Sequence, residues 1–302
     1  MQLLCVGEAF DDLIFMNLER LPRAGEEIRT SHFVRTVGGG AVITAVAASR
    51  LGLRTGVVGG LGPQAVARLR AERVGFVNLR RRDEPHAVSA ALSTARDRSF
   101  VTFNGVNDVL DARLFGMRTR IHAPIVHFAF RPEHCGRWTT FVRQLRRRGT
   151  IASWDFGWNA SLVRDPGLPQ LLGALDYVFV NEQEAMLYTR TRTLSAAVRA
   201  WRAVTAHTVI KLGARGSRWI GPGRDLFAPV RRRKAVDTTG AGDAFNGGFL
   251  YGVSRGLRPD DCLRVANLVG SASTRSAGGL DGLPTLEQLP RVPPLTPRRD
   301  SR

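Results

Sequence analysis

Short apolar runs alternate with helical patterns along most of the chain. The stretches "LLCVGEAFDDLIF" (3–15), "APIVHFAF" (123–130) and "TIASWDF" (150–156) are typical of buried strands, and "AVITAVAASRLGL" (41–53) is typical of a buried helix. Strand, turn and helix follow one another again in "LDYVFVNEQEAMLY" (175–188). This alternation predicts βαβ units and an α/β fold with a mostly parallel central sheet.

Two regions depart from this alternation. Residues 13–37 and 87–104 contain alternating, strand-like pieces without a good helical pattern. We expect them to form a small β sheet that projects from the main body. The last ten residues, "PPLTPRRDSR", are rich in proline and arginine, so we expect a flexible tail over 293–302 after a single domain over 1–292.

Length and composition allow a large globular domain. The chain has 302 residues, of which 43% are hydrophobic, and no run of eighteen apolar residues predicts a membrane span. Its first residues lack the basic region of a secretory signal. The cysteines Cys5, Cys135 and Cys262 form no Cys-x-x-Cys pair, which indicates a reduced, cytoplasmic protein without structural zinc.

The formal net charge of +18 is the least ordinary bulk property. Arginine clusters occur at 80–82, 143–148 and 231–233 and in the last residues. One interpretation is nucleic-acid binding. The other, which we favour, is a set of solvated arginines, because the clusters are scattered, few aromatic residues interleave with them and no nucleic-acid-reading motif accompanies them. A positive field would still attract an anionic substrate such as ATP.

The run "DTTGAGDAFNGGF" (237–249) concentrates glycines just before an apolar stretch. A helix that begins near 241–243 would direct its free backbone N–H groups at the turn, where they attract phosphate. Asp243 beside a bound anion makes chemical sense if its carboxylate accepts the proton of an attacking hydroxyl group. The alternative is that Asp243 only caps the helix. The turn alone leaves these two interpretations nearly even.

Other nucleotide-binding motifs are missing. A P-loop needs Gly-Lys-Ser/Thr, and neither lysine of the chain, Lys211 or Lys234, follows a glycine. A dinucleotide fingerprint needs Gly-x-Gly-x-x-Gly after a strand, and neither "GLGPQA" (60–65) nor "GGGAVI" (38–43) completes it.

At this point the chain resembles a known family. "DTTGAGDAFNGGF" is similar to the C-terminal motif of the ribokinase-like (PfkB) sugar and nucleoside kinases. In the same order along the chain, "GGGAVITAVAASRLG" (38–52) resembles the N-terminal motif, "VNEQEA" (180–185) the Asn-x-x-Glu motif, and "IKLGARGS" (210–217) the nucleotide-binding strand and turn. The resemblance implies a three-layer αβα fold with a mostly parallel sheet and a small β lid.

The resemblance also implies roles for individual residues. Asp243 would be the catalytic base, in a turn that forms an anion hole with Gly240, Ala241 and Gly242. The acceptor would be held by Asp12, Gly38, Gly39 and Asn107. The nucleotide site would include Asn181, Lys211, Gly213, Gly216 and Asn267, with Glu184 in the Mg²⁺ network. A monovalent cation such as K⁺, which many members bind, would lie at Asp237, Thr239, Ser273 and Gly278.

The chain departs from the family pattern mainly on the acceptor side. Phe10 and Ile43 stand where asparagine is usual, and Gln64 replaces an acidic residue. If Phe10 and Ile43 both face the acceptor, a ribose-like sugar loses contacts worth roughly 0.5–1.5 kcal/mol each. This favours a nucleoside or an unusual sugar over ribose.

We therefore expect an ATP- and Mg²⁺-dependent kinase that acts on a hydroxyl group of a sugar or nucleoside. The lid would exclude water and join two copies in a homodimer. The alternative from another class is a non-catalytic sugar- or nucleotide-sensing protein on the same fold, which contacts nucleic acid through its arginines. A kinase transfers the phosphoryl group of ATP to its ligand, whereas a sensing protein binds the ligand without this transfer.

Overall fold

The computed structural model describes residues 1–94, 98–231 and 234–289. In this part of the chain, nine strands form the main sheet. Seven neighbouring strands are parallel to one another, and the other two pair antiparallel at one edge. Their order across the sheet is β13 (Arg224–Ala228), β12 (Ser217–Gly221), β11 (Thr208–Lys211), β10 (Tyr177–Asn181), β9 (Ile151–Asp155), β8 (Ile125–Ala129), β1 (Leu3–Gly7), β4 (Thr55–Gly59) and β5 (Gly75–Asn78). The predicted mostly parallel sheet is confirmed.

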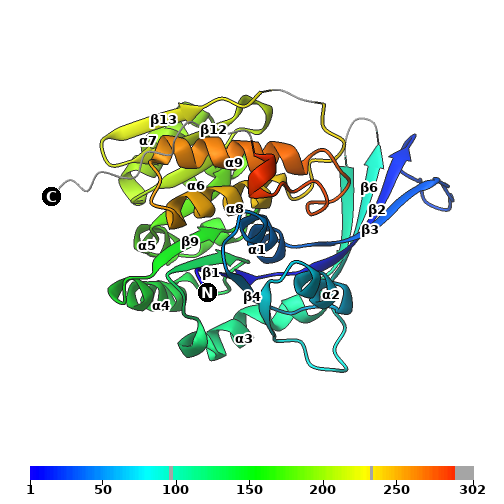
Figure 1. The fold of residues 1–302 in the computed structure, drawn as a ribbon, viewed down its shortest axis with the longest axis horizontal. Helices are drawn as coiled ribbons and strands as arrows, with labels where there is room; N and C mark the ends of the chain where they lie inside the picture. The colour runs from blue at the N-terminus through cyan, green and yellow to red at the C-terminus, as the bar shows by residue number, and fades with distance from the viewer. Residues whose placement is uncertain (95–97, 232–233, 290–302) are drawn as a thin grey trace.

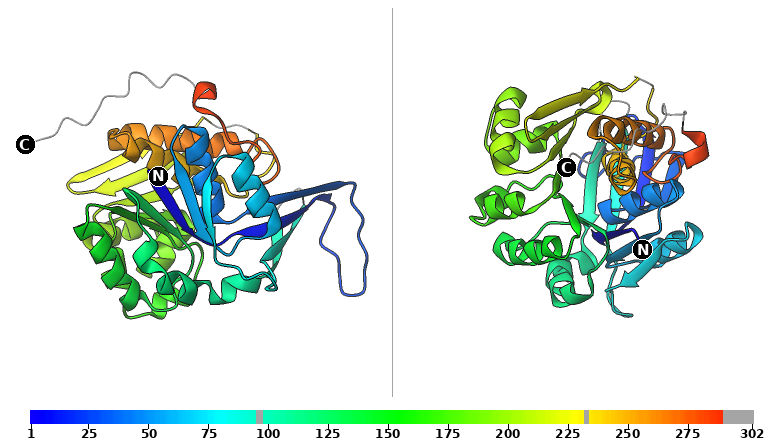
Figure 2. Two further views of the ribbon diagram at one scale, coloured as in Figure 1. Left: turned by 60° about the horizontal axis from the view of Figure 1, so that its bottom comes forward. Right: turned by 60° about the vertical axis from the view of Figure 1, so that its left-hand side comes forward.

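Helices cover both faces of this sheet (Figure 1; Figure 2, right). One face carries α1 (Gly40–Arg50), α2 (Pro63–Ala71), α8 (Ala241–Ser254) and α9 (Pro259–Ser273). The other face carries α3 (Leu110–Gly116), α4 (Cys135–Arg147), α5 (Leu168–Ala174), α6 (Glu182–Thr189) and α7 (Leu194–Val204).

The strand sequences explain the two cores. Successive side chains of a strand point to opposite faces of the sheet, so a strand covered on both faces is apolar throughout. In β1, Leu3 and Cys5 pack into the core with α1 and α8, whereas Leu4 and Val6 pack into the core on the other face. The continuous apolar runs of the sequence are therefore central strands of a three-layer fold.

A second sheet forms the lid. Its strands are, in order, β3 (His32–Gly38), β2 (Phe10–Leu18), β6 (Val88–Thr94) and β7 (Arg98–Phe103). The strands β2, β3 and β6 project from one side of the body (Figure 1). β6 and β7 fall within the second of the two regions where the sequence predicts a small sheet. β2 begins three residues before the first region and β3 ends one residue after it, so the predicted β lid is confirmed.

Close packing of α1 against α8 positions the glycine turn. A Cβ atom at Gly247 of α8 would lie 2.6 Å from the Cβ atom of Ala47, so the two helices approach closely. The Thr44 hydroxyl of α1 donates a hydrogen bond to the Asp243 carbonyl oxygen at 3.1 Å. The alanine-rich stretch 41–48 permits this approach, because its side chains are small and buried.

No described helix combines the length and the apolar character that a membrane span requires. The predicted tail over 293–302 lies outside the described residues.

Candidate active site

Three polar residues lie side by side at the carboxyl ends of the strands of the main sheet. Asp155, Asn181 and Lys211 are the last residues of the neighbouring parallel strands β9, β10 and β11. Ligands of open α/β sheets bind in the crevice at the carboxyl ends of such strands. Here a cavity of about 530 Å³ has these three residues in its lining, together with the beginning of α8.

The glycine turn presents the first amides of α8 to this cavity. Gly240 has a left-handed backbone with φ of 70°, and a Cβ atom there would lie 2.5 Å from Cδ1 of Ile43, so only glycine fits. Within the described residues, the amides of Gly242 and Asp243 donate to no backbone carbonyl group. Unpaired amides at a helix N-terminus favour an anion, and both residues line the cavity.

Asp243 is the third residue of α8 and does not cap the helix. The residue at the N-cap position is Gly240, and no side chain provides a capping hydrogen bond. The Asp243 carboxylate instead lies against Gly40, where a Cβ atom would be 3.1 Å from its Oδ1 atom. The carboxylate therefore belongs to the lining of the cavity of about 530 Å³ and at the same time contacts Gly40, the first residue of α1.

Burial and neighbouring charges raise the pKa of Asp243 to about 7. Burial has the largest effect, the carboxylates of Asp155 and Glu184 add to it, and the Lys211 ammonium opposes it. Lys211 Nζ lies 2.6 Å from Oδ2 of Asp155, and the same oxygen accepts a hydrogen bond from Asn246 Nδ2 at 2.7 Å. Burial opposes ionisation of Asp155, but Lys211 and Asn246 outweigh it and hold its pKa below the usual range.

Asn181 and Glu184 form a capping box at the start of α6. The Asn181 side chain accepts a hydrogen bond from the Glu184 amide at 2.9 Å, and Glu184 Oε2 accepts one from the Asn181 amide at 2.8 Å. Both residues also line the cavity. Burial, with the nearby Asp155 carboxylate, raises the pKa of Glu184 above its usual value. The structural role of this pair and a role toward a ligand are therefore compatible.

The other residues expected on the nucleotide side line the same cavity. Gly213 and Gly216 lie in the turn between β11 and β12. Asn267 of α9 donates from Nδ2 to the Ala228 carbonyl oxygen at 2.9 Å. The structure therefore brings together residues that are up to 112 positions apart in the sequence, from Asp155 to Asn267.

The residues expected on the acceptor side gather beside the lid. Asp12 lies in β2, and its carboxylate occupies the space that a side chain at Gly38 would need. Gly39 is the N-cap residue of α1. Asn107 donates from Nδ2 to the Ala9 carbonyl oxygen at 3.3 Å, and its buried Oδ1 meets no hydrogen-bond partner among the described residues.

Asp12 shares the electrostatic environment of the glycine turn at 240–242. Burial raises its pKa to about 7, and the carboxylates of Asp11, Asp237 and Asp243 act in the same direction. The Asp243 carboxylate therefore lies close enough to Asp12 to raise the pKa of the Asp12 carboxyl group.

The residues expected to hold a monovalent cation have other partners. The Asp237 carboxylate and the Thr239 hydroxyl group accept hydrogen bonds from the guanidinium of Arg98, the first residue of lid strand β7. The Gly278 amide donates to Asp237 Oδ2 at 2.8 Å, and the Ser273 hydroxyl group donates to the Gly270 carbonyl oxygen at 2.8 Å.

The structure also changes the interpretation of Ile43. Its side chain is buried, and its Cδ1 atom packs against Gly240 of the glycine turn and against Gly279. Ile43 therefore supports the turn by packing against it. The expectation that its apolar side chain faces the acceptor is wrong.

Sequence reasoning missed Asp155 and Arg98. Asp155 ends a buried apolar strand, which is the position where α/β folds place ligand-binding groups, so this signal was available. Arg98 is one arginine among many on a strand-like segment, and no local pattern distinguishes it.

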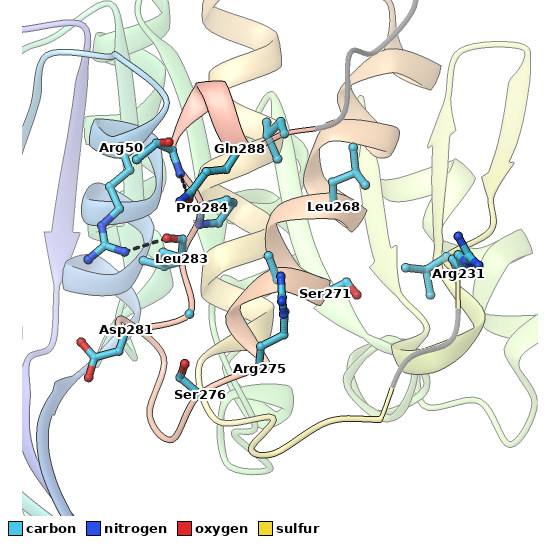
Figure 3. A pocket seen from close by; sticks show the side chains of 15 residues that line it. Arg50, Arg231, Leu268, Ser271, Arg275, Ser276, Asp281, Leu283, Pro284 and Gln288 are labelled. Atoms are coloured by element: carbon cyan, nitrogen blue, oxygen red, sulfur yellow. Dashed lines mark hydrogen bonds between the residues drawn. The ribbon is translucent and has the colours of Figure 1, made fainter.

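A second cavity of about 950 Å³ lies beside the first, and the two share Val230, Arg231 and Ser271 in their linings. Figure 3 shows Arg50, Arg231 and Arg275 around it, with the Arg50 guanidinium donating to the Leu283 carbonyl oxygen at 2.7 Å. Its lining lacks the carboxylates of Asp155, Glu184 and Asp243. The smaller cavity, which has all three in its lining, is therefore the candidate active site.

Three comparisons with known proteins extend over nearly the whole chain. The family described as "pfkB family carbohydrate kinase" matches residues 1–286. An uncharacterized sugar kinase of Escherichia coli K12, YegV, is 27% identical over 297 residues, which cover 94% of this chain and 91% of that protein. The ribokinase of Bacillus subtilis 168 is 25% identical over 301 residues, which cover 96% and 98%. The solved structure of Arabidopsis thaliana ribokinase complexed with ribose and ATP matches with a TM-score of 0.75 at 25% identity, over 95% of this chain and 96% of that one.

Proposed function

Because the chain belongs to the pfkB family of carbohydrate kinases, we propose that Asp243 is the general base that activates a hydroxyl group of a sugar or nucleoside for attack on the γ-phosphorus of ATP. The contact between the Asp243 carboxylate and Gly40 supports this role most directly. The carboxylate lies against Gly40, which directly follows Gly38 and Gly39, the two glycines expected to hold the acceptor, and it is close to the free amides of Gly242 and Asp243. A base must reach the proton of the attacking hydroxyl group, and this position allows it.

The pKa of about 7 suits this role. A base works best when its pKa lies near the working pH, because it is then partly deprotonated and still binds a proton well. Burial is the largest cause of the rise, Asp155 and Glu184 add to it, and Lys211 opposes it. When the hydroxyl group attacks, its proton passes to the carboxylate, and the new P–O bond forms as the bond to ADP breaks.

Two groups would stabilise the charge on the transferring phosphoryl group. The turn Gly240–Gly242 offers the unpaired amides of α8. The Lys211 ammonium lies close to the same turn, since a Cβ atom at Gly242 would be 3.1 Å from Nζ. Preorganised donors of this kind act strongly in a site from which water is excluded.

The donor set fits Mg²⁺ bound mainly through the nucleotide. In the part of the chain that the structure describes, no group of three or more His, Cys, Asp or Glu side chains is arranged to hold a metal ion. Mg²⁺ in kinases usually takes one or two carboxylates and completes its shell with phosphate oxygens and water. Glu184 lines the cavity and would supply such an oxygen, directly or through water. The bound ion would neutralise phosphate charge.

The acceptor would be held by Asp12, Gly38, Gly39 and Asn107. Asp12 and the unpaired Oδ1 atom of Asn107 offer oxygen acceptors that suit the hydroxyl groups of a sugar ring. Since Ile43 packs beneath the turn, the apolar side chain there gives no reason to exclude a polyhydroxylated acceptor. Phe10 of β2 remains the apolar departure on this side, so the proposed acceptor class covers both free sugars and nucleosides.

The lid would also join two copies of the chain. Phe33 of β3 and Phe100, Val101 and Phe103 of β7 are each more than half exposed. β7 is an edge strand of the lid in the described part of the chain, and an exposed apolar edge favours pairing with another chain. A second lid that pairs along β7 would cover Phe100, Val101 and Phe103.

We expect the protein to work in the cytoplasm. Among the described residues, Cys5, Cys135 and Cys262 are all buried and form no disulfide bond, so they need no oxidising compartment.

An assay of ADP release across a panel of sugars and nucleosides tests the proposed function. We expect Mg²⁺-dependent release of ADP with one acceptor class and, in parallel, formation of that acceptor's phosphate ester. Tight binding of a panel member without phosphate ester formation would support a sensing protein instead.

A further inference from the structure

Arg98 joins the lid to the catalytic turn. Its guanidinium donates from Nη1 to the Asp237 carboxylate and the Thr239 hydroxyl group, and from Nη2 to the Thr238 hydroxyl group. These partners lie more than a hundred positions away in the sequence, in the segment that leads directly into Gly240. One side chain of the lid therefore holds three consecutive residues of the body.

Asp237 is the centre of this arrangement. Its Oδ1 atom accepts hydrogen bonds from the Thr239 amide at 2.9 Å and the Thr239 hydroxyl group at 2.8 Å, while Oδ2 accepts one from the Gly278 amide. The carboxylate thus ties together the lid, the turn and the loop after α9. A shift of Asp237 would move Thr239 and, with it, the start of the anion-binding turn.

The ion pair differs from the surface pairs of this protein. The Asp237 side chain is 4% exposed and that of Arg98 is 26% exposed, whereas Arg20 and Glu26 of another lid pair are 51% and 34% exposed. An exposed pair contributes little, but a buried carboxylate that loses its partner carries a large penalty. Removal of Arg98 would therefore leave the buried Asp237 carboxylate without the positive charge that compensates it.

We propose that Arg98 is a positioning residue for phosphoryl transfer, which fixes the Gly240–Gly242 turn as the lid closes and takes the place of a monovalent cation at Asp237. The donor set expected to bind K⁺ does not fit that ion here, since the carboxylate and hydroxyl oxygens already bind the guanidinium. The link to catalysis rests on the proposed function of the turn. Lid closure over the acceptor and completion of the anion site then become one event.

Four proteins test this inference: the wild type, Arg98→Ala, the double variant Arg98→Ala/Asp237→Asn, and Arg20→Ala as a control that removes an exposed lid pair. Thermal unfolding and the rate of ADP release are measured in buffer without alkali cations and then with added K⁺ or guanidinium. The wild type and Arg20→Ala should not respond to either cation. Arg98→Ala should lose about 10²-fold in kcat, because the turn is misplaced.

The changes in Tm and kcat on addition of K⁺ or guanidinium decide whether Arg98 replaces a cation. K⁺ or guanidinium should raise the Tm of Arg98→Ala and restore much of its kcat. A small cation can enter the space that the Arg98 guanidinium leaves and bind the Asp237 carboxylate there. The double variant should show no cation-dependent rise in Tm. Activation of the wild type by K⁺, normal kcat in Arg98→Ala, or a cation-independent Tm in Arg98→Ala would each overturn the inference.

The Tm measurements need no turnover, so they separate this inference from the proposed function. If the wild type forms no phosphate ester but the Tm pattern is as expected, the proposed function fails and the cation replacement stands. If ester formation is normal and the Tm pattern is absent, only the inference about Arg98 fails.

Discussion

The ammonium group of Lys211 lies 2.6 Å from the carboxylate of Asp155, and this pair joins the carboxyl ends of β11 and β9 in the cavity that the Gly240–Gly242 turn also lines. Both residues act on the charge of Asp243 and in opposite directions, since Asp155 raises its pKa and Lys211 lowers it. Burial is the largest cause of the raised pKa of Asp243, and this pair adjusts that pKa and so the pH range in which the proposed base is deprotonated.

The variant Asp155→Asn should shift the acid limb of the pH profile to lower pH. In the wild type, kcat/KM should fall as the pH drops through about 7, because Asp243 becomes protonated. Asparagine removes the negative charge that raises this pKa and leaves the Lys211 charge less neutralised, and both changes lower the pKa of Asp243. The amide oxygen of the new side chain can still accept hydrogen bonds at the same position. An acid limb that stays in place or moves to higher pH would contradict this electrostatic account.

Gly240→Ala should abolish most activity while the protein stays folded. The added Cβ atom needs space that Ile43 fills, and the left-handed backbone costs about 1–2 kcal/mol for alanine. Displaced amides at the turn should reduce kcat by about 10²-fold or more. Steady-state kinetics and chemical unfolding measure the two effects.

Gly256→Ala is the matched control for this substitution. Gly256 follows α8 with φ of 67°, and a Cβ atom there meets open space. It should show a similar backbone cost in unfolding but normal kcat. Equal kinetic effects of the two variants would mean that the position of the turn does not matter for turnover.

Ile43→Asn should destabilise the protein and should not improve the use of ribose. Asparagine would bring an amide into the apolar packing under Gly240 and Gly279, at a cost of about 2–5 kcal/mol. Ile43→Val, which keeps the site apolar, should cost only about 0.5–1.5 kcal/mol. A lower KM for ribose in Ile43→Asn, measured by ADP release, would show that this position faces the acceptor after all.

Much of this architecture could be predicted from local patterns. The continuous apolar runs predict central strands because both faces of a parallel sheet are covered, and β1 bears this out with its alternating side chains in two cores. The glycine turn could also be identified, because a phosphate site at a helix N-terminus is built from neighbouring residues. These features depend on short stretches of sequence, so a single sequence is enough.

The long-range contacts could not be predicted in the same way. The contact between Arg98 and Asp237 joins the lid to the body, and nothing near either residue in the sequence indicates it. The orientation of Ile43 depends on how closely α1 approaches the turn at Gly240, which only the packed structure determines. Motif positions therefore indicated which residues gather at the site, but not how each side chain points.

Phe100→Glu should prevent association through the lid. Phe100 is 55% exposed on the edge strand β7, and a charge there would be buried without a partner if two lids pair. The mass in solution, measured by light scattering, should fall from that of a dimer to that of a monomer. Phe227→Glu is the matched control, because Phe227 is 57% exposed on β13, outside the lid. A monomeric wild type would refute the proposed dimer.

The substitution Asp243→Asn tests the central claim most directly. Asparagine matches the shape of aspartate but cannot accept the proton of the acceptor hydroxyl group. Single-turnover formation of the phosphate ester, with ATP affinity measured separately, should show a loss of about 10²–10⁴-fold in rate with little change in ATP binding. A rate of ester formation near that of the wild type would contradict the assignment of Asp243 as the general base.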